Sequence, residues 1–540
     1  MRLGKWIAAC ATSALILAGC GGKAADPQAA AGSILKVNLG AEVQDLDPQI
    51  VTGVPEHRAL TALFAGLADL DPATLEPEPG AAESWTVSED YLVYTFKLRA
   101  NGKWSNGEPV TASDFEYAWQ RMLSPGLAAE YSYLLHHIKG AKDYNDGKVA
   151  DWTTVGVKTL DPLTLEVTLD HPTPFFLSML YHQSFFPVHK ATIEKFGKMD
   201  ERGTKWTQAG NHVGNGAFKL TEWRPHEYIL TARNEHYWDA ANIRLDGVQF
   251  FPIDDMLTEE RSFRTGEVHM TEQMPLHKID VYRKENPEAL QVRPYLGNYF
   301  YRFNTTRKPL DDVRVRLALS MAVDRETLCR EVLKAGEPPA FNLTPPGTAG
   351  YTSNAKMTYD PERAKQLLAE AGFPNGEGFP KLELLYNTSE THATIAEVLQ
   401  RMWKETLGIE IGLYNQDWKV YLDSMTNLDY DIVRGSWIGD VVDPLNFLEL
   451  FLTEGGNNRT GWSSPKYDEL IQQAYGTPDK EARYALQQEA EALLLEEAPM
   501  LPIYFYSTKY LKAPEVKGFT PNILDYRRWK DMWLETPAAS

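Results

Sequence analysis

The alternation of apolar and polar side chains has the two-residue period of strands through much of the first half of the chain. Residues 34–40 and 91–104 follow this period, and residues 250–253 form the short apolar run of a buried strand. Residues 110–123 instead place apolar side chains three and four positions apart, which predicts a helix. The first half is therefore expected to be rich in strands.

Helical and strand patterns alternate more regularly in the second half. The predicted helices cover 311–333, 361–372 and 391–408, and the predicted strands cover 381–389, 409–416 and 501–507. Asp360 is placed to cap the second of these helices, Pro361 suits its first turn and Gly372 suits its end. Such alternation is typical of an α/β layered lobe.

The N-terminal segment has the features of an export signal. Basic residues precede an apolar stretch over 6–18 that is too short to cross a bilayer. Leu17 to Cys20 match a bacterial lipobox, so Cys20 is the expected site of lipidation. A plain secretory signal is the alternative. We predict a lipoprotein signal peptide over 1–19, a flexible tether over 20–33, and a periplasmic protein lipid-anchored to a membrane.

Charge, cysteine content and length limit the possible partners, crosslinks and number of lobes. The formal net charge of −20 at pH 7 argues against nucleic acid as a partner. Of three cysteines, only Cys329 lies beyond the signal peptide and the lipidation site, so no internal disulfide and no cysteine metal site is expected. A folded part of about 500 residues exceeds what one core usually supports, so two or three lobes are expected.

The sequence lacks the common catalytic motifs G-x-S-x-G, H-E-x-x-H and the phosphate-binding P-loop. His136 and His137 are adjacent, so on a helix they point in different directions and make a poor metal site. Asp440 and Asp443 could imitate a glycosidase acid/base pair, but nothing places a nucleophile, a base and a charge stabiliser together. We expect no enzyme and no cofactor; a hydrolase is the remote alternative.

Six segments carry a resemblance to a known family. They are 42–56, 81–123, 309–325, 360–373, 384–392 and 434–444. As a set they resemble the large extracytoplasmic solute-binding proteins of peptide ABC importers, and the last two resemble the peptide-binding subgroup. The resemblance covers nearly all of the chain beyond the tether.

The resemblance implies an α/β fold: a two-lobed periplasmic-binding-protein clamshell of type II, cluster C, with an extra third domain. It implies lobe I from 34–65, 190–296 and 506–540, an additional domain II over 66–189, and lobe II (domain III) over 297–505. The expected partners are short peptides and the permease and ATPase of the importer, and the protein is expected to be a monomer.

The resemblance also assigns roles to the two charges of the segment 434–444. Asp440 is expected to receive the α-ammonium of a bound peptide, and Arg434 and His392 its C-terminal carboxylate, depending on peptide length. This is chemically sensible, because a charge removed from water needs an opposite partner. Protonation of His392 near its usual pKa of about 6.5 would strengthen that contact. Without the resemblance, Arg434 and Asp440 would be taken for solvated charges.

Backbone and aromatic groups complete the expected groove. Main-chain groups of Gly435 to Ile438, and of Val54 across the groove, can pair with the peptide backbone as an added strand. Trp437 lies between the two charges. Trp418 and Tyr506 match aromatic residues that line the groove, although core packing is equally compatible with either.

The chain departs from the family at several positions. Leu333 stands where some members have a lysine for longer peptides, and Gly297 and Ile438 stand where some have a cysteine pair. Arg302 adds a charge to an expected groove strand, where it either contacts ligand or is solvated. The ligand alternatives are murein peptides or a non-peptide ligand such as a metal chelate, haem or a sugar. A neutral sugar has no use for Asp440.

Overall fold

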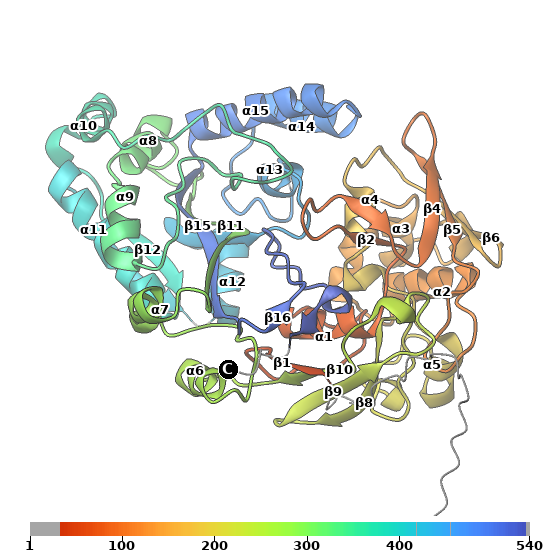
Figure 1. The fold of residues 1–540 in the computed structure, drawn as a ribbon. Coiled ribbons are helices and arrows are strands. Elements are labelled where there is room, and N and C mark those ends of the chain that lie inside the picture. Colours follow the sequence, from red (N-terminus) through yellow and green to blue (C-terminus); the bar gives the residue numbers. More distant parts are fainter. Residues whose placement is uncertain (1–32, 417, 454, 536–540) are drawn as a thin grey trace, which may run out of the picture. The chain divides into compact units, whose positions relative to one another are not determined.

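The computed structural model describes residues 33–535 except 417 and 454. The predicted signal peptide, nearly all of the tether and Cys20 lie outside these residues. Most described strands belong to three sheets (Figure 1). Within the described residues, no helix is long and apolar enough to cross a membrane.

The first sheet has the order β1-β10-β9-β8. Its strands are β1 (Ile34–Asn38), β10 (Gly247–Phe251), β9 (Tyr228–Arg233) and β8 (Phe218–Arg224). β1 pairs in parallel with β10 although more than 200 residues separate them. The sequence predictions for 34–40 and 250–253 are therefore confirmed, and the two predicted strands are direct neighbours.

The second sheet is antiparallel, with the order β4-β5-β7-β6. Its strands are β4 (Ala82–Val87), β5 (Val93–Leu98), β7 (Thr164–Thr168) and β6 (Val157–Asp161). The predicted helix over 110–123 is α2 (Ala112–Leu123), which contacts β6 and β7. Thr111 and Asp114 form a capping box that fixes the start of this helix.

The third sheet has five strands in the order β13-β12-β14-β11-β15. They are β13 (Ile411–Gln416), β12 (Leu382–Asn387), β14 (Ile432–Ile438), β11 (Leu290–Phe303) and β15 (Met500–Leu511). β12 runs parallel to β13 and β14, whereas β11 runs antiparallel to β14 and β15. The long strands β11 and β15 lie side by side at the centre of Figure 1.

One detail of this sheet matters for the site. β11 pairs with β14 along its whole length, from Ile432 to Ile438. β12 pairs with β14 only at Ile432 and Val433. Among the described strands, the part of β14 from Arg434 to Ile438 therefore has a neighbour on one side only. We call its other side the free edge of β14.

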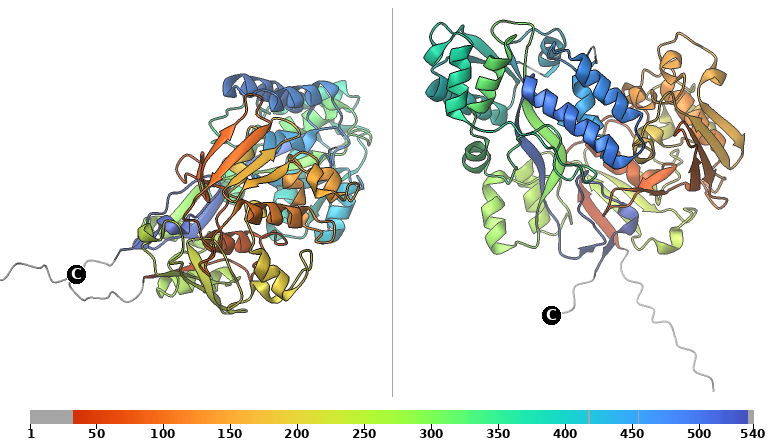
Figure 2. Two further views of the ribbon diagram at one scale, coloured as in Figure 1. Left: turned by 90° about the vertical axis from the view of Figure 1, so that its right-hand side faces the viewer. Right: turned by 90° about the horizontal axis from the view of Figure 1, so that it is seen from above.

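Helices cover both faces of the five-stranded sheet. The longer ones are α8 (Val313–Met321), α10 (Pro361–Glu370), α11 (Glu390–Leu407), α12 (Trp418–Thr426), α14 (Pro465–Tyr475) and α15 (Lys480–Glu497). α14 and α15 pack side by side, as Figures 1 and 2 both show. The alternation of helices and strands predicted for this half is confirmed, including the cap on α10, where Asp360 accepts a hydrogen bond from the backbone of Arg363.

Alternating residues of β11 pack into two different hydrophobic cores. Tyr299, Tyr301 and Phe303 pack into one hydrophobic cluster, whereas Leu296 and Phe300 belong to another that also contains residues of the first two sheets. Both faces of this strand are therefore buried. Cys329 is also buried, as expected for an inert thiol, and it is a free cysteine. The domain limits given above stay predictions.

A buried ion pair holds the segment that leads into the site. Arg121, in the last turn of α2, contacts both carboxylate oxygens of Asp47, at 2.6 and 2.9 Å, and donates to Gln49 at 2.6 Å. Arg121 and Asp47 are almost completely buried. The chain then enters α1 (Val54–Leu63), which begins at the candidate site.

We expect Asp47→Ala to lower the free energy of unfolding by about 3–5 kcal/mol, because it leaves the guanidinium of Arg121 buried without its counter-ion. Urea denaturation measures this loss. As a control, Glu410→Ala breaks the exposed pair with Lys404 and should change the free energy by about 0–1 kcal/mol. Equal losses for the two variants would contradict the assigned role of the buried pair.

Candidate functional site

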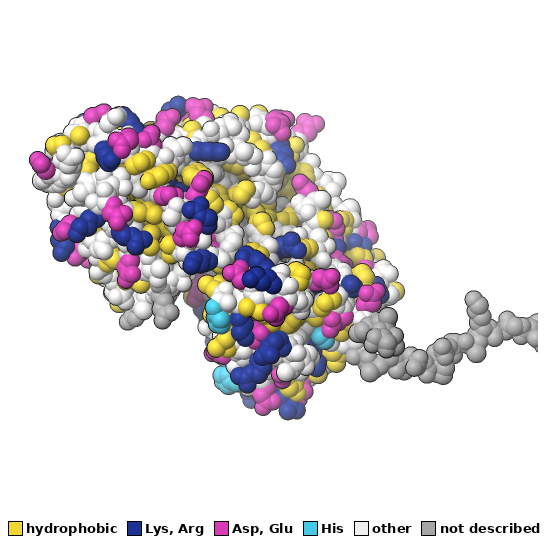
Figure 3. Space-filling model, turned by 60° about the vertical axis from the view of Figure 1, so that its left-hand side comes forward, with side chains coloured by type: hydrophobic (Ala, Val, Ile, Leu, Met, Phe, Trp, Pro, Cys, Tyr) yellow, Lys and Arg dark blue, Asp and Glu magenta, His cyan; other side chains and the backbone are white. Residues whose placement is uncertain are grey.

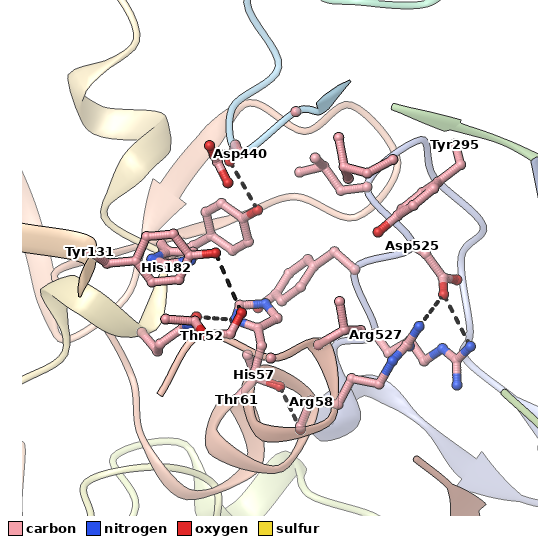
Figure 4. A pocket seen from close by; sticks show the side chains of 18 of the residues that line it. Thr52, His57, Arg58, Thr61, Tyr131, His182, Tyr295, Asp440, Asp525 and Arg527 are labelled. Carbon is pink, nitrogen blue, oxygen red and sulfur yellow. Dashed lines mark hydrogen bonds and ion pairs between the residues drawn. The ribbon is translucent and has the colours of Figure 1, made fainter. Parts of the chain in front are cut away.

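A cavity of about 480 Å³ adjoins the end of β14. It is lined by the start of α1, by aromatic residues near 131–133 and 181–183, by the end of β14 with Asp440, and by the segment 524–527 (Figure 4). Of the residues predicted from the sequence, Asp440, Trp437, Ile438 and Val54 line this cavity. Segments that are hundreds of residues apart in the sequence therefore form one site.

Asp440 is the unusual group in this cavity. Its backbone N–H donates to Asn446 at 2.9 Å, and its carbonyl oxygen accepts from Tyr181 at 3.5 Å. Within the described residues, its carboxylate has no hydrogen-bond donor and no basic partner. Removal of its carboxyl group from water raises the pKa of Asp440 to about 6. The cavity thus contains a carboxylate that can bind a cation and that has none as a partner among the described residues.

The surroundings of Asp440 combine aromatic rings with open apolar surface. Tyr131 and Tyr181 reach the cavity from outside the five-stranded sheet, and the Tyr131 hydroxyl donates to the Thr52 carbonyl oxygen at 3.4 Å. Trp437 donates to Asn446 at 3.2 Å, so the same amide oxygen positions both Trp437 and the backbone of Asp440. Val54 is 46% exposed.

The far side of the cavity holds a second charged group that the sequence reasoning missed. Arg58 contacts Asp525 at 2.6 Å and Glu272 at 2.8 Å, and Arg527 contacts Asp525 at 3.0 Å. Figure 4 shows Asp525 and the two arginines away from Asp440. Two arginines and two carboxylates balance one another here, so this network has no need of an external ion.

Arg434 lies on β14, outside the residues that line the cavity. One of its terminal nitrogens donates to the Tyr506 hydroxyl at 3.0 Å, the other is 3.5 Å from the Asn387 side-chain oxygen, and the guanidinium carbon lies 4.8 Å above the Tyr299 ring. The residue is buried, and none of the described carboxylates forms an ion pair with it. Arg434 is therefore a buried cation held only by neutral groups.

His392, in the first turn of α11, joins the same cluster. Its Nδ1 atom is 3.2 Å from the Tyr299 hydroxyl. Burial, with a smaller contribution from the positive charge of Arg434, lowers the pKa of His392 to about 4. In the ligand-free protein, burial and the nearby guanidinium therefore favour the neutral imidazole, and protonation on contact with a peptide carboxylate stays a prediction.

The predicted site residues thus form two groups along one strand. Asp440, with Trp437, Ile438 and Val54, belongs to the cavity, and Arg434 with His392 and Tyr506 forms the second cluster. Gly435 is buried between the two groups, where the Phe300 ring leaves no space for a Cβ atom. Trp418 begins α12, and its side chain lies outside what the structure describes.

The structure also shows where the residues that depart from the family pattern lie. Gly297 and Ile438 are cross-strand partners in the β11–β14 ladder. Leu333 ends a short helical segment (Leu328–Leu333), and Lys334 follows in the left-handed conformation. Arg302 is only 4% exposed, so the interpretation as a solvated charge is wrong.

The distribution of charged side chains over the surface is even on the face that we show. On the face shown in Figure 3, acidic and basic side chains are interspersed, so the negative net charge is not gathered there into one area.

Comparison with known proteins identifies the class to which this fold and site belong. The model of the bacterial extracellular solute-binding proteins, family 5, matches residues 76–459. The periplasmic oligopeptide-binding protein OppA of Salmonella typhimurium is 40% identical over 497 residues, with 89% of each chain covered. The periplasmic murein peptide-binding protein MppA of Escherichia coli is 39% identical over 490 residues, again with 89% of each chain covered.

Solved structures agree with these relatives. The unliganded open form of the murein tripeptide-binding protein MppA has a TM-score of 0.81 at 37% identity and covers 94% of this chain and 98% of its own. Haemophilus influenzae OppA in complex with the peptide RPPGFSPFR has a TM-score of 0.76 at 32% identity, with coverages of 94% and 100%. The protein belongs to the extracellular solute-binding protein family 5, and the predicted periplasmic-binding-protein fold class is confirmed.

We expect the affinity for a peptide with a free amino terminus to be highest between pH about 6 and 8 and to fall by up to tenfold per unit below pH 6. An ammonium requires the ionised form of Asp440, whose pKa of about 6 in the empty site exceeds the ordinary 3.8, so binding at lower pH must release a proton. Above about pH 8 the peptide ammonium itself deprotonates. Isothermal titration across this range measures the profile. Asp440→Asn should remove the fall below pH 6, and an unchanged profile would contradict the role of Asp440.

Proposed function

We propose that this protein is an extracytoplasmic solute-binding protein that binds short peptides and delivers them to the permease of an ABC importer. The observation that carries the proposal is a partly buried carboxylate, Asp440, without a donor or cation among the described residues. Arg434, a buried guanidinium without a carboxylate, stands six residues earlier. A zwitterionic peptide offers the complementary charges at its two ends. The names of the relatives support a peptide ligand and a periplasmic location.

The free edge of β14 supports the proposal that the backbone of a bound peptide pairs with this strand. Extended segments commonly bind by adding a strand to an unpaired edge. The unpaired part of β14 runs from Arg434 to Ile438, between the two charged groups. Val54, at the start of α1, faces the same cavity and offers a second backbone contact. Such pairing does not depend on the peptide sequence, so one site accepts many peptides.

The two ends of the site have different tasks. Asp440 serves every peptide, because each has an α-ammonium in the same place. Arg434 and His392 lie farther along the strand and meet the carboxylate of particular lengths, at about 3.3 Å per added residue. Tyr506, which Arg434 contacts, orients the guanidinium. Because this arrangement binds termini and contains no assembled nucleophile and base, we assign the protein no catalytic role.

Murein peptides are a second candidate ligand class, favoured by the similarity to MppA in sequence and structure. A murein tripeptide also has a peptide backbone, so Asp440 and the free edge of β14 would hold it as well. Competition between a murein tripeptide and trialanine for the purified protein ranks the two ligands. A neutral sugar is disfavoured, because it leaves Asp440 without a cation.

We expect N-acetylation of a tripeptide to weaken binding to the wild-type protein by about 2–5 kcal/mol, which is roughly 30-fold to a few thousand-fold in Kd. Acetylation removes the ammonium and leaves the partly buried carboxylate of Asp440 without a partner. Asp440→Ala should lose a similar amount for the free peptide and should discriminate little between free and acetylated peptides. Isothermal titration calorimetry measures all four combinations.

Asp429→Asn is the control for this experiment, because Asp429 is a strongly exposed aspartate that pairs with Arg307. This variant should bind both peptides as the wild-type protein does. If acetylation has no effect on the wild-type protein, the ammonium role of Asp440 is wrong. If no peptide raises the thermal midpoint or binds in calorimetry, the ligand is not a peptide.

We also propose lipid anchoring through Cys20, which lies outside the described residues. Cys20→Ser should move the protein from the membrane fraction to the soluble periplasmic fraction, because acyl chains are attached to the thiol. Fractionation followed by mass spectrometry of the mature N-terminus measures this. A wild-type protein that is already soluble, with a mature N-terminus elsewhere, would rule the anchor out.

A further inference from the structure

Eight arginines are buried in the part of the chain that the structure describes, and six of them have either a carboxylate or several backbone carbonyl oxygens as partners. Arg58, Arg121, Arg483 and Arg527 form ion pairs with carboxylates, and Arg316 and Arg325 donate to backbone carbonyl oxygens at 2.6–3.2 Å. The two exceptions are Arg434 and Arg302. The proposed function gives Arg434 a partner, the peptide carboxylate. Arg302 is left without one.

Arg302 lies near the end of β11 and is 4% exposed. One terminal nitrogen is 3.2 Å from the sulfur of Met425, a weak acceptor, and the other is 3.5 Å from the carbonyl oxygen of Asn457, at the limit of a hydrogen bond. Its Nε atom has no partner. Burial lowers the pKa of Arg302 to about 10, so the side chain remains charged at neutral pH.

The charged neighbours of Arg302 do not compensate it. Arg459 and Arg434 both act on Arg302 as like charges, and the facing phenols of Tyr430 and Tyr421 are neutral at pH 7. The Nε atoms of Arg459 and Arg434 are likewise buried without a hydrogen-bond partner. Among the described residues, none of the three arginines forms an ion pair. Positive charge therefore accumulates at this place, and a buried charge of this kind requires an anion.

The position of Arg302 relative to the free edge of β14 indicates where that anion comes from. α12 packs against β12 and β13, and its Tyr421 hydroxyl donates to the backbone carbonyl oxygen of Arg434, where the free edge begins. Met425, four residues further along α12, contacts Arg302. One helical turn is about 5.4 Å, which is comparable to the length of a glutamate side chain. Arg302 is the cross-strand partner of Val433, the residue directly before the free edge, so its guanidinium lies close to the place where a bound strand would begin.

We propose that Arg302, assisted by Arg459, forms a second anion-binding subsite that receives an acidic side chain of the bound peptide. This rests on the proposed function, because it needs a peptide along the free edge of β14. Guanidinium binds carboxylate through paired, charge-assisted hydrogen bonds, which a carboxamide reproduces poorly. The protein is thus selective for peptides with Asp or Glu at one position, while the rest of the groove remains indifferent to sequence.

The test uses tetra-alanine and the eight peptides that carry one Glu or one Gln at each position, measured by isothermal titration with the full chain. At one position, the wild-type protein should bind the Glu peptide at least about tenfold more tightly than the Gln peptide. Arg302→Leu should reduce this ratio to about one, and Arg302→Lys should keep part of it. Arg330→Leu is the matched control, because Arg330 is exposed and paired with Glu331, and it should keep the full ratio.

The thermal midpoint without peptide separates a binding role from a structural one. Arg302→Leu removes an uncompensated buried charge, so the midpoint should stay the same or rise; a clear fall would mean that the arginine serves the fold. Equal binding of Glu and Gln peptides at every position, or a preference that persists in Arg302→Leu, would overturn the subsite alone. A wild-type protein that binds none of the peptides would overturn the proposed function and the subsite together.

Discussion

The arrangement of this protein depends on one electrostatic constraint: an ionised side chain that is removed from water needs an opposite charge. Most buried charges in this protein have such a partner within the chain: Arg121 pairs with Asp47, and Arg58 pairs with Asp525. Asp440 and Arg434 do not, among the described residues. Under the proposed function, the empty site therefore has an unfavourable electrostatic free energy, which a ligand carrying both charges would relieve. The strength of binding and the instability of the empty site have the same origin.

The geometry of β14 prevents the two charges from neutralising each other. An extended chain separates residues six positions apart by roughly 20 Å, so Arg434 and Asp440 cannot meet. β11 holds this strand along its whole length, and Asn446 fixes the backbone of Asp440 beyond its end. Because β12 leaves β14 after Val433, the backbone between the charges remains open to a ligand. The extended chain thus separates the charges, and the early end of the pairing with β12 provides an edge for a peptide to pair with.

The sequence predicted local features well and long-range electrostatics poorly. α10 and α2 follow from caps and apolar spacing, which depend on residues near one another in the chain. The ion pair of Arg58 with Asp525 joins positions 467 residues apart, and no local pattern encodes it. The low pKa of His392 likewise depends on burial and, to a smaller degree, on Arg434, and both arise only in the folded protein. A family resemblance singles out Asp440 and Arg434 in the sequence, but only the fold shows that the described residues contain no charged partner for either.

Missing partners are therefore more informative than charge alone. Sequence reasoning gave Arg302 two roles, solvated or in contact with ligand, and burial removes the first. The remaining arginines of the interior show that this fold readily supplies carboxylates or carbonyl oxygens to a buried guanidinium. This chain provides close carboxylates or carbonyl oxygens for six of its eight described buried arginines. The other two, on the adjacent strands β11 and β14, have no carboxylate partner and only neutral contacts, so the need for anions is localised. The two arginines lie at or next to the free edge of β14. A ligand that pairs with this edge is therefore expected to supply one anion to Arg434 and one to Arg302.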